Sequence, residues 1–258
     1  MRVVCWFSCG AASACAAKLT IEEHPDAVVA YCASTLSTEH PDNARFLRDC
    51  EEWLGRSVVM LYAEKYSDIF DVFERTGWLV GPGGARCTTE LKKLVRRRYE
   101  RPDDIQVFGF DATESRRADL FRRNNVGVTL STPLIDRGID KEGCLRMIDA
   151  AGIDLPAMYG LGYRNNNCVG CVKGGAGYWN KIRVDFPEVF ERMAAIERSM
   201  GVAICKTEPM VNGVRLRVPV YLDELRPAAG RYEGEPAIQC GVLCGIDEQL
   251  TLFNRGAP

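Results

Sequence analysis

The sequence predicts an α/β fold in which helices cover both faces of a parallel sheet. Two observations support this prediction. Short segments that are apolar throughout alternate with segments of helical spacing over the first half of the chain, as they do in βαβ units. The apolar segments are not interrupted by regularly spaced polar residues, which is typical of strands buried on both faces.

Each element is expected from its own local pattern. β-branched and aromatic residues predict strands at 2–8, 26–34, 57–64 and 104–112. Apolar residues at helical spacing predict helices at 11–24, 40–55, 140–152 and 185–201. Gly55 is expected to end the second helix. Asp185 is expected to cap the fourth, with Pro187 in its first turn.

The C-terminal part is expected to be less regular. Asn212-Gly213 predicts a hairpin turn, and the chain beyond it is rich in Gly, Pro and charge. We therefore expect residues 1–205 to form the α/β domain, together with a cysteine cluster. Residues 206–258 are expected to form a hairpin and an irregular, cysteine-containing tail.

Composition excludes several classes of protein. Of the 258 residues, 47% are hydrophobic and 26% are charged, which suits one large globular domain with or without an appendage. The formal net charge of -2 means that a polyanion would have to bind at a local basic patch. No apolar run of about 18 residues and no signal-peptide pattern is found, so we expect a cytoplasmic protein without a membrane span.

The chain contains twelve cysteines. A disulfide framework is not expected in a reducing compartment. Five cysteines lie in apolar strand-like runs or on apolar helical faces, and these are expected to be core residues: Cys5, Cys15, Cys32, Cys50 and Cys144. Cys205 fits either group. Six lie in polar or glycine-rich settings: Cys9, Cys87, Cys168, Cys171, Cys240 and Cys244.

Polar loops follow the first, second and fourth expected strands. Ligands of open parallel sheets bind at the carboxyl ends of strands, so these loops are the places to look for a site. "FSCGAASA" places Ser8, Gly10 and Ser13 between a strand and a helix, where backbone N–H groups can hold a phosphate. The turn lacks the GK[ST] ending of a Walker loop, and such a turn alone is more often structural. Ser34 lies in the second loop, "ASTLSTEHPDN".

The third loop, "FGFDATESRR", supplies Glu114, Ser115 and Arg117. Two interpretations stay open. The loop either contacts a nucleotide, or it is a helix start that Thr113 caps and that carries acidic residues in its first turn.

A basic run, "ARCTTELKKLVRRRYERP", is by default a solvated helix face. It places Cys87 just before a helix that Thr88 or Thr89 would cap. A thiol in that position has a lowered pKa. Lys92 lies about one turn further along, where it would face an anion.

The segment "NNNCVGC" holds Cys168 and Cys171. Thiolates around a metal explain such a pair in a cytoplasmic chain better than a disulfide does. Together with Cys87 the pair gives the spacing C-x80-C-x2-C, so the three sulfurs are expected to meet around one centre. Cys240 or Cys244 would be a further ligand. A redox dithiol, a structural loop and zinc in place of an iron–sulfur cluster stay open.

Taken in order, these segments resemble the phosphoadenosine-phosphosulfate reductase family of the adenine nucleotide α-hydrolase (PP-loop ATP pyrophosphatase) superfamily. "FSCGAASACAAKL" resembles its phosphate-binding turn and helix, and "STLSTEHPDNARFL" the loop and helix after its second strand. "RCTTELKK" resembles its cysteine-then-lysine segment, and "FGFDATESRR" its substrate-contacting loop. The resemblance implies a Rossmann-like fold and an adenine nucleotide substrate.

The cysteines match this family in part. The reductases that carry a cluster, which we take as [4Fe–4S] here, have a cysteine pair followed about 80 residues later by CxxC. In this chain Arg86 replaces one cysteine of the first pair. A cluster with three thiolate ligands keeps one iron open, as in related thiolases that modify tRNA. Cys244 would close the cluster if it were the fourth ligand.

Two more positions bear on the reaction. The Glu-Cys-Gly-Leu-His motif at the end of those reductases resembles the tail that begins at Gln239, which implies that Cys240 is the nucleophile. ATP-cleaving members carry an aspartate where this chain has Ala12. The absence of that carboxylate argues against the usual pyrophosphate chemistry.

The leading hypothesis is therefore a sulfonucleotide reductase. Cys240 would attack the sulfur of a bound adenylyl sulfate, and a thiol reductant would complete the reaction. Lys92 and Arg117 would neutralise the sulfate. The expected nucleotide-binding residues are Ser8, Gly10, Ser13, Ser34, Glu114 and Ser115.

Two alternatives stay open. One is an ATP-dependent sulfurtransferase that uses a sulfur donor to modify a tRNA or DNA base. The other is a metal-stabilised nucleic-acid-binding module, in which Tyr178 and Trp179 stack on bases between basic residues. A core-facing position for these two aromatic residues is favoured over stacking.

Overall fold

The computed structural model describes residues 1–81, 84–166, 168–207, 210–211 and 214–238. Its central element is a five-stranded sheet in which every neighbouring pair is parallel. The strands are β1 (Val3–Phe7), β2 (Val28–Cys32), β3 (Val59–Leu61), β6 (Ile105–Val107) and β7 (Thr129–Ser131). Their order is β3-β2-β1-β6-β7. The α/β fold class is confirmed.

Helices cover both faces of this sheet, as the uniform apolarity of β1 predicts. Val3, Cys5 and Phe7 belong to one buried cluster, and Val4 and Trp6 belong to another on the opposite face. The first face packs against α1 (Ala11–Glu23), α2 (Asn43–Leu54), α7 (Pro133–Asp136) and α8 (Lys141–Ala150). The second packs against α5 (Leu94–Tyr99) and α6 (Ser115–Asn124).

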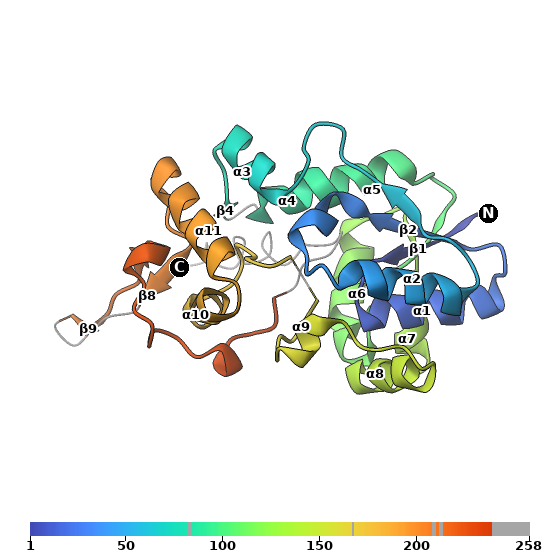
Figure 1. The fold of residues 1–258 in the computed structure, drawn as a ribbon. Coiled ribbons are helices and arrows are strands. Elements are labelled where there is room, and N and C mark those ends of the chain that lie inside the picture. The colour runs from blue at the N-terminus through green and yellow to red at the C-terminus, as the bar shows by residue number, and fades with distance from the viewer. Residues whose placement is uncertain (82–83, 167, 208–209, 212–213, 239–258) are drawn as a thin grey trace.

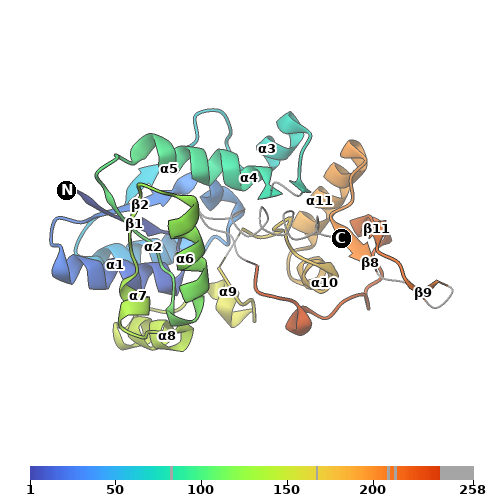
Figure 2. The same ribbon diagram turned by 180° about the vertical axis from the view of Figure 1, so that it is seen from behind.

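A second group of elements forms its own core beside the sheet (Figures 1 and 2). Its helices are α3 (Ile69–Thr76), α4 (Arg86–Thr88), α9 (Ala157–Gly160), α10 (Ala176–Asp185) and α11 (Pro187–Met200). Its strand pairs are β4 (Val80–Gly81) with β5 (Gly84–Ala85), and β8 (Cys205–Thr207) with β11 (Val218–Val220). The expected division between residues 205 and 206 falls inside β8, whose partner β11 lies in the second part.

The expected hairpin near residue 212 is present. Its strands are β9 (Met210–Val211) and β10 (Val214–Arg215), which pair antiparallel with Val211 opposite Val214. The two turn residues lie outside the described residues.

One helix start differs from the expectation. Asp185 does not cap α11, because it is the last residue of α10. There its carboxylate accepts a hydrogen bond from the Tyr163 hydroxyl at 2.8 Å. The backbone residue before α11 is Phe186, which makes no side-chain cap, and Pro187 occupies the first turn as expected. Gly55 ends α2 in the left-handed conformation with φ of 67°, also as expected.

The cysteines of the described residues are all free thiols. Each of the five that were expected to be structural is buried: Cys5, Cys15, Cys32, Cys50 and Cys144. None of the helices among the described residues is long and apolar enough to cross a membrane.

Candidate functional site

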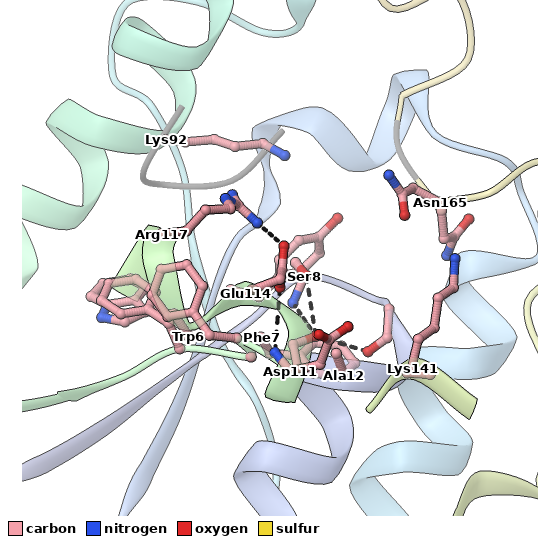
Figure 3. Close-up of a pocket in the computed structure, with 18 of the residues that line it drawn as sticks. Trp6, Phe7, Ser8, Ala12, Lys92, Asp111, Glu114, Arg117, Lys141 and Asn165 are labelled. Carbon is pink, nitrogen blue, oxygen red and sulfur yellow. Dashed lines mark hydrogen bonds and ion pairs between the residues drawn. The ribbon is translucent and has the colours of Figure 1, made fainter. Parts of the chain in front are cut away.

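A pocket of about 220 Å³ opens at the carboxyl ends of β1 and β6. From β1 the chain continues to β2 on one side, and β6 adjoins β1 on the other. This is the point where the strand order reverses, which is where parallel α/β sheets bind their ligands. Its wall comprises the turn after β1, the loop after β6, and the segment at Asn165 and Asn166 (Figure 3).

The turn after β1 is shaped by internal hydrogen bonds. The Ser13 hydroxyl donates to the Gly10 carbonyl at 2.9 Å and accepts from the Ser8 N–H at 3.1 Å. Gly10 precedes α1 without a side-chain cap, and the Tyr159 hydroxyl lies against the backbone of Ala11. The predicted Ser8, Gly10 and Ser13 all line the pocket. The amino end of a 13-residue helix therefore faces it, which favours an anion there.

Cys9 lies at the centre of this turn but does not line the pocket. It has φ of 52° and is the one described non-glycine residue with a positive φ. Its side chain is fully buried, and burial raises the pKa of its thiol well above the usual range. Cys9 is therefore a buried neutral residue, although its setting in the sequence is polar.

Three basic side chains surround the pocket. Lys92 comes from the π-helical segment Thr89–Lys93 and is 7% exposed. Arg117 comes from α6 and forms an ion pair with Glu114. Lys141 comes from the first turn of α8, and its ammonium lies 5.6 Å from the centre of the Tyr159 ring. Figure 3 shows the three around one space.

The charge of the pocket is mixed. Burial lowers the pKa of Lys141, an effect that nearby Asp111 partly opposes. Asp111 and Glu114 also line the pocket. The Asp111 carboxylate accepts a hydrogen bond from the Thr113 N–H at 2.8 Å and caps the short helix at 112–114. The alternative interpretation, in which Thr113 caps the helix start, is therefore wrong about the capping residue. The loop also contributes to the pocket.

The remaining wall is aromatic. The aromatic residues that line the pocket include Trp6, Tyr31, Phe108 and Phe110. The Trp6 indole N–H donates to Gln106 Oε1 at 2.5 Å, which fixes the ring on the sheet. Flat apolar surfaces of this kind suit a planar base, whereas the basic side suits a charged group.

Two predicted nucleotide-binding residues do not line the pocket. Ser34 is buried, and its hydroxyl accepts a hydrogen bond from the Ala63 N–H at 2.7 Å. Ser115 is exposed, and its hydroxyl donates to the Ala112 carbonyl at 3.1 Å. Both hydroxyls hold local backbone. The sequence prediction missed Lys141 and Asn166, because only the tertiary fold places them at this edge.

The predicted metal ligands come from two parts of the chain. Cys168 and Cys171 are each 6% exposed, and Cys87 packs against the same hydrophobic cluster. Cys87 lies inside α4 and not before it, and Ala85 occupies the N-cap position, so neither Thr88 nor Thr89 caps the start of this helix.

The sequence predicts that these three thiols are ligands of one soft metal centre. Among the described residues, no group of three or more His, Cys, Asp or Glu side chains is arranged to hold a metal ion. The expected nucleophile Cys240 and the further expected ligand Cys244 lie outside the described residues. The metal centre therefore stays a prediction.

Tyr178 and Trp179 face the core and do not form a stacking platform. They are 4% and 0% exposed. The Tyr178 hydroxyl accepts hydrogen bonds from the N–H groups of Gly170 at 3.0 Å and Cys171 at 2.9 Å. It thereby holds the loop that carries the cysteine pair. The favoured core-facing interpretation is confirmed, and the stacking interpretation is wrong.

Hydrogen bonds hold the segment 231–238 against the loop at Arg164. The Tyr232 hydroxyl accepts a hydrogen bond from the Arg164 N–H at 2.9 Å, and the Arg164 guanidinium donates to two carbonyls of the segment. Asn165 Nδ2 donates to the Ile238 carbonyl at 2.7 Å. Ile238 itself lines the pocket, two residues before Cys240 in the sequence.

Glu235 ties the same segment to α10. Its carboxylate accepts hydrogen bonds from the N–H groups of Gly177 at 2.6 Å, and of Gly175 and Tyr178 at 3.2 Å each. We expect Glu235→Gln to lower the unfolding free energy by about 1 kcal/mol, because the helix start loses a negative charge and one acceptor oxygen. Urea denaturation checks this value. Glu233→Gln, whose side chain makes no such cap, is the matched control; an equal loss in both variants would contradict the role of Glu235.

Comparison of the chain with models of known protein families finds no match, and a search of curated proteins finds none either. The functional conclusion therefore depends on the pocket and on the residues that line it.

Proposed function

We propose that the pocket binds an adenine nucleotide with an anionic group and that the chain is a sulfonucleotide reductase-like enzyme. One observation carries the proposal: Lys92, Arg117 and Lys141 converge with the amino end of α1 at the switch point of a parallel sheet. Such an arrangement suits a phosphate or sulfate. The aromatic wall beside it suits the base. The resemblance to the phosphoadenosine-phosphosulfate reductase family supports the choice of adenine and of sulfur chemistry.

The proposed reaction has two steps. The thiolate of Cys240 attacks the sulfur of the bound adenylyl sulfate. A sulfur–sulfur bond forms, the bond from sulfur to the bridging phosphate oxygen breaks, and the nucleotide leaves as its 5′-phosphate. A thiol reductant then attacks the cysteine sulfur, sulfite leaves with the bonding electron pair, and a disulfide remains. Lys92 and Arg117 stabilise the charge on the leaving phosphate oxygen and the sulfonate.

Cys87, Cys168, Cys171 and Cys244 are the proposed ligands of an iron–sulfur cluster. Bound there, such a cluster would supply thiolate-ligated iron. Ile238 supports the proposed place of the nucleophile, because this pocket residue is two positions from Cys240. We assign no further step to the cluster.

The test is an anaerobic assay of the full chain with a thiol reductant. Adenylyl sulfate and its 3′-phosphorylated form should bind in calorimetry, and sulfite should be released from one of them. Binding and consumption of ATP, with sulfur transfer to tRNA or DNA and no sulfite, would replace the proposal with the sulfurtransferase alternative. Iron and sulfide analysis of the anaerobically purified protein tests the cluster separately.

Lys92→Met is expected to weaken binding of adenylyl sulfate about tenfold. The substitution keeps the length of the side chain but removes a buried cation, and a charge-assisted hydrogen bond contributes about 1.5–3 kcal/mol. Isothermal titration calorimetry measures the change. Lys93→Met is the matched control, because Lys93 is the next residue of the same helical segment and does not line the pocket. Equal affinities for the two variants would remove Lys92 from the site.

A further inference from the structure

A buried polar network lies behind the turn after β1. Its centre is Glu39, which is 6% exposed. The Glu39 carboxylate accepts hydrogen bonds from the Tyr31 hydroxyl at 2.7 Å, the Thr35 hydroxyl at 2.8 Å and Asn43 Nδ2 at 2.8 Å. A carboxylate with three donors fixes the direction of every hydrogen bond that leads away from it.

The direction of the network continues to the pocket wall. Because Asn43 Nδ2 donates to the carboxylate, Asn43 Oδ1 must be the acceptor toward its next neighbour. That neighbour is Asn166, whose Nδ2 donates to Asn43 Oδ1 at 2.7 Å and to the Cys9 carbonyl at 2.6 Å. Both acceptors fix the amide of Asn166 in one orientation, with Nδ2 toward the network and Oδ1 away from it.

Asn166 Oδ1 is the end of this network and has no hydrogen-bond partner among the described residues. The residue is 6% exposed and lines the pocket. A buried acceptor without a donor carries a free-energy cost, and natural proteins keep few of them. Because the residue lines the pocket and its amide is held in one orientation, Oδ1 is the atom of Asn166 that is left to accept a hydrogen bond from a ligand group packed against the residue.

We propose that Asn166 Oδ1 accepts a hydrogen bond from a neutral donor of the bound nucleoside and so determines ligand specificity. This inference rests on the proposed function, since it assumes that the pocket holds a nucleotide. A sulfate or a fully ionised phosphate has acceptors and no proton to donate. We therefore expect the anionic end of the ligand to lie away from Asn166 Oδ1. The donor is a ribose hydroxyl or the amino group of the base.

The test compares four nucleotides with the unmodified protein by calorimetry. Adenosine 5′-phosphate has every donor. Its 2′-deoxy and 3′-deoxy forms each lack one hydroxyl, and inosine 5′-phosphate has a carbonyl in place of the amino group. The analogue that lacks the relevant donor is expected to bind about tenfold more weakly, because it leaves Oδ1 unpaired. The other two should bind as adenosine 5′-phosphate does.

Variants link this preference to the residue. Asn166→Ala should weaken the binding of adenosine 5′-phosphate about tenfold. The variant should then bind the discriminating analogue as tightly as it binds adenosine 5′-phosphate. Asn180→Ala is the matched control: Asn180 Oδ1 is also buried and unpartnered among the described residues, but it lies away from the pocket. Should Asn166→Ala fail to fold by circular dichroism, Asn166→Ser replaces it with the same expectation.

Two results would overturn the inference, and they differ in what else they affect. Equal binding of all four nucleotides by the unmodified protein, or discrimination that persists in the Asn166 variant, would remove the role of Asn166 and leave the proposed function intact. Failure of the protein to bind adenosine 5′-phosphate and the adenylyl sulfates alike would overturn both.

Discussion

A Tyr178→Phe variant is expected to lose about 2–6 kcal/mol of unfolding free energy. The hydroxyl of Tyr178 is buried and accepts the N–H groups of Gly170 and Cys171. Phenylalanine fills the same space but leaves both N–H groups buried without an acceptor, at about 1–3 kcal/mol each. The Tyr178 ring packs directly on Gly174, so the phenylalanine ring is held in the same place.

The same variant should change the chemistry of the cysteine loop. Gly170, in the middle of the pair, has φ of 76°, and a Cβ there would lie 2.6 Å from Val189 Cγ1. The loop therefore has one tight conformation, which the Tyr178 hydroxyl secures. Alkylation of Cys168 and Cys171, followed by mass spectrometry, should be faster in the variant than in the unmodified protein.

Tyr232→Phe is the control for this prediction. Its hydroxyl accepts a single hydrogen bond, from the Arg164 N–H, and the residue is half-buried. We expect a loss of about 1 kcal/mol or less in urea denaturation, with unchanged alkylation rates. Equal losses in the two variants would show that Tyr178 does not hold the loop.

The central strands could be predicted from sequence because their pattern is strong and local. β1 and β2 lie in the middle of the sheet, so nearly every residue is buried and apolar. The edge strand β7 was not predicted. Two of its three residues, Thr129 and Ser131, are polar, so it carries no continuous apolar signal. The other edge strand, β3, is equally short but apolar throughout, and it was predicted.

The site residues also divide into those that a local sequence pattern predicts and those that only the tertiary fold brings to the pocket. Ser8, Gly10 and Ser13 could be predicted because a strand, a turn and a helix follow one another directly in the sequence. Asn166 reaches the pocket through hydrogen bonds to Asn43 and Cys9, which are 123 and 157 positions away. No local pattern records such contacts. Ser34 fits the loop pattern equally well, yet its hydroxyl is used by the backbone of Ala63.

Gly109→Ala is expected to destabilise the fold by about 3 kcal/mol and to weaken nucleotide binding. Gly109 is the second residue of the loop after β6 and lies directly on the first turn of α1. A Cβ there would lie 2.7 Å from Ser13 N, and 2.8 Å from Ser13 Cα and from Ala12 C. All three are backbone atoms, so no side chain can rotate away, and overpacking of this kind costs about 1–3 kcal/mol or more.

The expected loss of binding follows from the backbone shift that the added Cβ requires. To make room, either α1 or the loop that carries Asp111 and Glu114 has to shift, and both form walls of the pocket. We expect at least a tenfold loss in adenylyl sulfate affinity, measured by calorimetry at a temperature where the variant is folded. Gly160→Ala is the matched control, because a Cβ at that position meets no atom within 4 Å and alanine favours a helix by about 1 kcal/mol over glycine. Equal stability and equal ligand affinity of Gly109→Ala and Gly160→Ala would contradict this prediction. The close approach of the loop to α1 would then not be needed, and the amino end of that helix would lose its support as part of the anion site.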